Sequence, residues 1–151
     1  MLEPAVKRYP FHVALRFLLL RAQRSLGRFS EAEEVVREIV RRHPSNAAGL
    51  IQLAWVHELD GRDDEALRVL ETAIGRDPQN AELPNALVEI HLRNGRLDRA
   101  RGIVEETLAR LPTNVFWRER SIQFLLQCGK GDAALDVARE GVVSFPRGAY
   151  L

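Results

Sequence analysis

The sequence predicts an all-α solenoid of four helical hairpins, because three series of residues repeat along it with one period. Prolines stand 34 residues apart, at Pro10, Pro44, Pro78, Pro112 and Pro146. Glycines follow the same period, at Gly27, Gly61, Gly95 and Gly129. Alanines stand five residues after each of these glycines, at Ala32, Ala66, Ala100 and Ala134. A fixed period of this length is typical of repeat proteins whose unit is a pair of helices.

Each unit is expected to contain a first helix, a tight turn, a second helix and a short turn. In residues 47–80, apolar side chains recur three or four residues apart on both sides of Gly61, as two helices with one buried face each require. They are Leu50, Leu53 and Ala54 before the glycine, and Leu67, Leu70, Ala73 and Ile74 after it. The glycine stands where a chain leaving a helix often turns left-handed, and the proline cannot continue the second helix. The small alanine lets the two helices of a hairpin approach closely.

Polar residues with short side chains mark where the helices are expected to begin. Three residues after each of these glycines stand candidate caps for the second helices. They are Ser30, Asp64, Asp98 and Asp132. Ser30 and Glu33 also have the spacing of a capping box. Two residues after a proline of the series, Asn46, Asn80 and Asn114 are placed to cap the next first helix.

This unit resembles the tetratricopeptide repeat, and the resemblance covers nearly the whole chain. Residues 47–80 match the pattern best, with Leu53, Ala54, Gly61, Ala66, Ala73 and Pro78 in place. The expected repeats are residues 13–46, 47–80, 81–114 and 115–148. Residues 1–12 are interpreted as the tail of a preceding helix or an N-terminal extension, and residues 149–151 as the truncated start of a further unit. The resemblance implies a right-handed superhelix with a concave groove.

The pattern is weaker outside residues 47–80. The position that the small residue Ala54 occupies holds Leu20, Val88 or Ile122 in the other repeats. In addition, Pro84 falls inside the first turn of its helix. These departures affect the expected packing of single helices and leave the repeat assignment unchanged.

The net charge and its distribution indicate which classes of partner the chain is expected to bind. The chain has 151 residues, with 22 Lys and Arg against 21 Asp and Glu, so its formal net charge is +1. Residues 1–46 carry nine basic against five acidic side chains, and residues 47–80 carry three against seven. We therefore expect neither nucleic acid nor an anionic membrane surface as a partner. The most apolar stretch, residues 13–20, is interrupted by Arg16 and is too short to span a bilayer, so a cytoplasmic location is expected.

The sequence predicts no enzyme, no cofactor and no metal site. His57 and His91 hold the same position in consecutive repeats, about 10 Å apart, too far to share an ion bound at about 2 Å. Each is expected to be half-buried between the helices of its hairpin. Cys128 is the only cysteine, and no activating group is near it in sequence. The chain contains no phosphate-binding glycine loop, metalloprotease motif or nucleophile elbow.

In the tetratricopeptide repeat family the first helices line the concave groove, which implies a set of candidate peptide-binding residues. They are Phe17, Arg21, Arg24, Ile51, Gln52, Trp55, Asn85, Glu89, Glu119, Arg120 and Gln123. Core packing does not require a large aromatic residue at Trp55, and Trp and Arg are enriched among binding hot spots. Two alternatives stay open: Trp55 fills the seam with the neighbouring first helix, or a segment of the chain itself occupies the groove.

The predicted function is that of a protein-interaction scaffold that binds a peptide or a helix. One alternative is self-assembly through uncapped repeat ends, and another is a recruiting domain of a larger enzyme. The acidic C-terminal tail of a chaperone is argued against, because family members that hold it use basic clamp residues. The matching positions here hold Phe17 with Arg21, Gln52, and Glu82 with Ala86, so two basic positions are missing and one is acidic.

Overall fold

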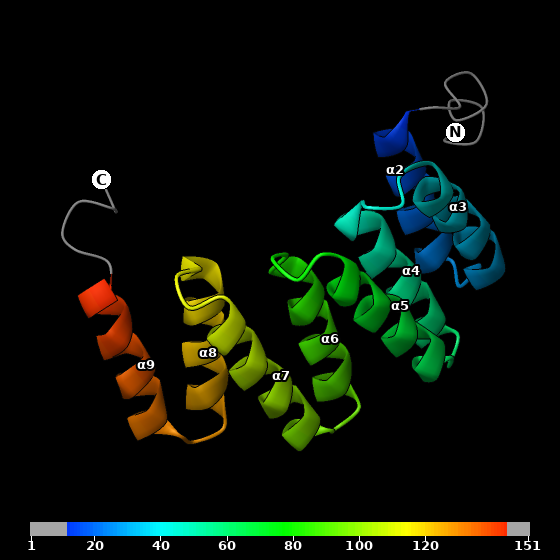
Figure 1. Ribbon diagram of the computed structural model, residues 1–151. Helices are drawn as coiled ribbons and strands as arrows, with labels where there is room; N and C mark the ends of the chain where they lie inside the picture. The colour runs from blue at the N-terminus through cyan, green and yellow to red at the C-terminus, as the bar shows by residue number, and fades with distance from the viewer. Residues whose placement is uncertain (1–11, 145–151) are drawn as a thin grey trace. The chain divides into compact units, whose positions relative to one another are not determined.

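The computed structural model describes residues 12–144, and this part of the chain contains eight α-helices and no strand (Figure 1). They pair as α2 (Val13–Ser25) with α3 (Phe29–Arg42), α4 (Ala47–Leu59) with α5 (Asp63–Arg76), α6 (Glu82–Arg93) with α7 (Leu97–Arg110), and α8 (Val115–Gln127) with α9 (Gly131–Ser144). The predicted all-α repeat architecture is confirmed. The expected features at residues 1–11 and 149–151 lie outside the described residues.

The chain divides into two compact parts, each with two helical hairpins, which we call the first unit (residues 1–78) and the second unit (residues 79–151). In the first unit, α3 packs against both α2 and α4, and α4 packs against α5. In the second unit, α7 packs against both α6 and α8, and α8 packs against α9. Within each unit, consecutive helices are therefore the ones that bury each other's apolar faces.

Each unit has its own hydrophobic core, which joins residues from three consecutive helices. The core of the first unit contains Leu20, Ala32, Val36, Leu53 and Val56. The core of the second unit contains Val88, Ala100, Val104, Trp117 and Phe124. The alanines that recur with the period are all buried, as their small size predicts. Burial between neighbouring helices is the usual source of stability in repeat proteins.

The glycine of each tight turn has the left-handed conformation that the sequence predicts. Its φ angle is between +68° and +74° in all four turns. In the second hairpin, the N–H of Gly61 donates to the carbonyl of Glu58, and the N–H of Arg62 donates to the carbonyl of His57. This pair of bonds is the Schellman motif, which satisfies carbonyl groups at the end of a helix.

The predicted caps of the second helices are wrong. Helices α3, α5 and α7 begin one residue before Ser30, Asp64 and Asp98, so these side chains lie inside the first turn. The residue before each helix is an arginine that makes no side-chain cap hydrogen bond. The reason is that the left-handed glycine and one further residue already complete the turn. Asp64, Asp98 and Asp132 instead place a negative charge in the first turn of their helices, where it stabilises the positive end of the helix dipole.

The capping box predicted for Ser30 and Glu33 is also absent, because Glu33 is engaged elsewhere. Its carboxylate accepts from Arg37, four residues on, and from Arg62 in the turn between α4 and α5. Glu33 therefore connects two hairpins of the first unit instead of closing the start of its own helix.

The asparagines do cap the first helices. Asn46 Oδ1 accepts from the N–H of Gly49 at 2.9 Å, and Asn114 Oδ1 accepts from the N–H of Trp117 at 2.9 Å. Asn80 Oδ1 accepts from the N–H groups of Glu82 and Leu83, at 2.9 and 3.2 Å. Pro84 follows inside the first turn of α6, where its missing N–H leaves no helical hydrogen bond unmade.

Candidate functional site

Helices α2 and α4 of the first unit form a groove of about 870 Å3, which we call the α2–α4 groove. Side chains three or four residues apart share one face of a helix, so both first helices present a continuous row of residues to it. The lining residues are Ala14, Phe17, Leu18, Arg21, Arg24, Ser25, Ala48, Gln52, Trp55 and Leu59. The structure thus brings together five of the six candidate residues of this unit. The sixth, Ile51, is half-buried on α4 and is not among the lining residues.

Arg24 holds the two helices of this groove together. Its Nη1 donates to Gln52 Oε1 at 2.5 Å, and its guanidinium carbon lies 5.3 Å from the centre of the Trp55 ring. The second contact is a cation–π interaction. Burial lowers the pKa of Arg24, although an arginine stays charged at neutral pH. Arg24 is therefore a structural part of the groove, and exposed Arg21 is the lining cation at its surface.

Trp55 lies both in the seam between α2 and α4 and in the lining of the groove. It contacts Arg24 across the seam with α2, and it also lines the groove. Its indole Nε1 is buried and has no hydrogen-bond partner among residues 12–144. A buried donor without a partner costs about 1–3 kcal/mol. Burial of this N–H group thus lowers the stability of the fold, while the position of Trp55 places an aromatic ring beside the groove.

In the second unit, three of the candidate residues bond to one another. Arg120 Nε, on α8, donates to Asn85 Oδ1 at 2.7 Å, and its Nη2 lies 3.2 Å from Glu89 Oε1, both on α6. Asn85 also donates to Glu89, at 3.5 Å. The remaining two, Glu119 and Gln123, are exposed on α8. The polar side chains of Asn85, Glu89 and Arg120 therefore bond α6 to α8 and are not free to hold a ligand.

The two histidines are more buried than the sequence predicts. His57 is 2% exposed and His91 is 6% exposed. Burial is the largest of the effects that lower the pKa of His57, followed by the charge of Arg62, so the ring is neutral at pH 7. Among residues 12–144, no group of three or more His, Cys, Asp or Glu side chains could hold a metal ion. Over the same residues, no helix is both long and apolar enough to cross a membrane.

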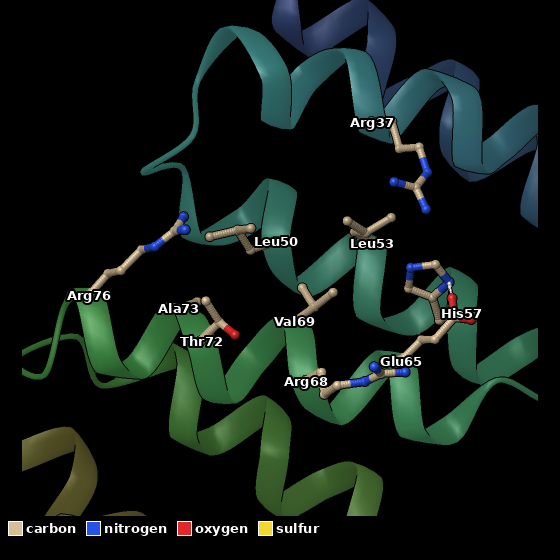
Figure 2. Close-up of a pocket in the computed structure, with 10 residues that line it drawn as sticks. All are labelled: Arg37, Leu50, Leu53, His57, Glu65, Arg68, Val69, Thr72, Ala73 and Arg76. Carbon is tan, nitrogen blue, oxygen red and sulfur yellow. Dashed lines mark ion pairs between the residues drawn. The ribbon is translucent and has the colours of Figure 1, made fainter.

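A second cavity of about 550 Å3 lies between α3, α4 and α5, and the sequence did not predict it (Figure 2). We call it the α3–α5 pocket. Its residues are Arg37, Leu50, Leu53, His57, Glu65, Arg68, Val69, Thr72, Ala73 and Arg76. Most belong to second helices, which the family resemblance does not assign to the groove. The signal that could have revealed it is the spacing of Arg68 and Arg76 on the same face of α5 as Val69 and Ala73.

Helical hairpins repeated with a constant period define this molecule as a helical-repeat protein, and sequence models identify its family. Models described as tetratricopeptide repeat match residues 1–47, 21–81 and 59–119. The chain therefore belongs to the tetratricopeptide repeat family. Proteins of this family generally mediate interactions between proteins and typically act as non-catalytic scaffolds. No curated protein matches the sequence.

Several solved structures are similar to this chain. A thermophilic protein of the same family from Thermus thermophilus, TTC0263, is 24% identical with a TM-score of 0.63, over 97% of this chain and 80% of that one. A MamA structure is 18% identical with a TM-score of 0.58, over 94% and 83%. A tetratricopeptide repeat protein of Parabacteroides merdae is 11% identical with a TM-score of 0.62, over 98% and 58%. At these identities the likeness shows the fold alone.

Proposed function

We propose that the chain is a scaffold that binds a peptide or a helix of another protein in the α2–α4 groove. The observation that supports this most strongly is the lining itself, in which most side chains are apolar. Two of these lining residues, Leu18 and Leu59, are 41% and 49% exposed. Exposed apolar side chains that gather in a hollow typically mark a binding surface. A cytoplasmic location is part of this proposal.

The chemistry of the lining suggests what the partner presents. Phe17, Leu18 and Leu59 can bury apolar side chains, and Trp55 offers an aromatic ring beside them. Arg21 is exposed and can pair with a carboxylate of the partner. A partner helix with apolar residues three or four positions apart would present one continuous face to this row.

A pull-down from lysate of the source cells tests this proposal. The native chain is compared with a double variant, Trp55→Ala with Arg21→Glu, whose helical content is checked by circular dichroism. A matched control, Phe116→Ala with Arg99→Glu, changes an exposed aromatic and an exposed arginine of the second unit. We expect a protein that the native chain and the control retain and the groove variant loses. Equal retention by all three chains would contradict binding in this groove.

A second candidate function is assembly with further copies of the chain, which the exposed face of α9 favours. Val142 and Val143 are 77% and 84% exposed, although both are apolar residues of a helix. Light scattering over a range of protein concentrations tests this candidate. If α9 packs against another copy, the mass rises with concentration, and Val142→Asp abolishes the rise. A constant mass equal to that of one chain would exclude it.

A further inference from the structure

The α3–α5 pocket lies on the opposite face of α4 from the α2–α4 groove. Helix α4 gives alternate positions to the two cavities: Ala48, Gln52, Trp55 and Leu59 line the groove, and Leu50, Leu53 and His57 line the pocket. Each set is spaced by three or four residues, and the sets are offset by two residues. Because a helix has 3.6 residues per turn, this offset places them on opposite faces. A ligand of the pocket would therefore not compete with a ligand of the groove.

Within the described part of the chain, some charged side chains of the pocket form ion pairs with neighbouring residues, and others do not. Arg37 pairs with Glu33, its Nη2 2.6 Å from the carboxylate, and Glu65 pairs with Arg62 at 3.1 Å. Within residues 12–144, neither Arg68 nor Arg76 forms an ion pair, and the only hydrogen bond of Arg68 goes to the carbonyl of Asp64 in its own helix, at 3.4 Å. The neutral ring of His57 adds no charge. The pocket thus offers two exposed guanidinium groups to a ligand.

The floor beside these two arginines is largely apolar, although exposed Thr72 stands midway between them on α5. Half-buried Leu50 and Val69 line the cavity, and so do Leu53 and Ala73, which are buried (Figure 2). Arg68 and Arg76 are eight residues apart on α5, a distance of about 12 Å along the helix axis. An extended peptide advances about 3.3 Å per residue, so side chains four residues apart are separated by a similar distance.

We propose that the α3–α5 pocket is a second binding site, which takes an extended acidic segment of a partner protein. One apolar side chain of that segment lies on Leu50 and Val69. Carboxylates two residues before and two residues after it pair with Arg68 and Arg76, where guanidinium groups can form bidentate bonds. Residues 47–80 carry three basic against seven acidic side chains, so the attraction comes from these local pairs and not from long-range steering.

Fluorescence anisotropy with a labelled peptide tests this site. The probe has blocked ends, aspartate at both ends, leucine in the centre and one alanine on each side of the leucine. We expect the native chain to bind it, and Arg68→Glu with Arg76→Glu to lower the affinity by about tenfold or more. Thr72→Trp, which places a large side chain in the pocket from an exposed position, should weaken binding without a change of charge.

Three controls make the result specific. Arg99→Glu, an exposed arginine of the second unit, and Trp55→Ala, in the groove, should both leave the affinity unchanged. A probe with lysines in place of the aspartates should not bind. No binding by the native chain, equal binding of the lysine probe, or loss of binding on Trp55→Ala alone would each overturn the proposal. So would an increase of mass that pocket substitutions abolish, because the occupant would then be a second copy of the chain.

Discussion

At the scale of single residues, the ion pair between Glu33 and Arg62 links two hairpins of the first unit. Arg62 lies in the turn between α4 and α5, and it also contacts Asp60 at 2.9 Å and Glu65 at 3.1 Å. The hydrogen bond from Arg62 is the largest effect that lowers the pKa of Glu33, to about 2. This pair joins α3 to the next hairpin, which a capping role for Glu33 would not have done.

Replacing Glu33 by Gln should lower the free energy of unfolding by about 1–2 kcal/mol at pH 7. This is less than the full pKa shift implies, because the pair keeps some contact with water. The folded state lowers the pKa of Glu33, so its contribution is complete above about pH 4.5 and is lost as the pH falls toward 2. Urea unfolding of both chains at pH 7 and at low pH measures this. An equal difference at both pH values would contradict the assigned pair.

His57 should make the first unit less stable as the pH falls below neutrality. Its pKa is lowered mainly by burial, with further contributions from the charges of Arg62 and Arg37, against the opposing effects of Glu33 and Glu65. The unfolded chain therefore binds a proton at a higher pH than the folded chain, and stability falls as the pH drops below about 6.5. His57→Leu should flatten the unfolding free energy between pH 7 and 5. A profile with an unchanged slope would show that other groups cause it.

At the scale of helices, the sequence predicted the turns well and the starts of the second helices poorly. The left-handed turn follows from the glycine itself, because few other residues adopt a positive φ angle without strain. The start of a helix depends on how few residues the turn needs, which the identity of Ser30 or Asp64 does not determine. The starts of α4 and α8 were predicted correctly, because Asn46 and Asn114 cap these helices two residues after a proline that cannot continue the preceding helix.

The contact between α8 and α9 shows a buried charge that periodicity did not predict. Arg118 on α8 is only 8% exposed, and its guanidinium donates to the carbonyl groups of Val137 and Pro112 at 2.7 and 2.6 Å. Its side chain passes beside Gly141, where a Cβ atom would lie 2.6 Å from Arg118 Cδ. Glycine at this position of α9 therefore leaves room for the arginine, a pairing visible only once both helices are placed.

Gly141→Ala should destabilise the second unit by about 1–3 kcal/mol, because the two hydrogen bonds of Arg118 hold its side chain in the way of the new methyl group. Thermal or urea unfolding measures the loss. In the background of Arg118→Ala, the same substitution should cost much less, since the clash is gone. Equal costs in both backgrounds would show that the clash is relieved by movement elsewhere.

At the scale of the whole molecule, the repeat register predicted more of the candidate site in the first unit than in the second. Residues that share a face of α2 and α4 line one groove because spacing along a helix fixes the direction of a side chain. Whether Arg120 reaches Asn85 and Glu89 depends on the distance between α6 and α8, which no spacing within one helix determines. The α3–α5 pocket was missed for a similar reason, since it requires three helices to be placed.

Separate cores predict that a defect in one unit stays local. Leu53 and Leu70 are 7% and 0% exposed, and replacing either by Ala should cost about 2–5 kcal/mol through lost burial and a residual cavity. In repeat proteins each unit interacts mainly with its neighbours, so the loss should appear first in the helices that contact the cavity. Hydrogen exchange should rise most in α3, α4 and α5 and least in α8 and α9. A uniform rise across all eight described helices would instead show that the two cores unfold as one cooperative body.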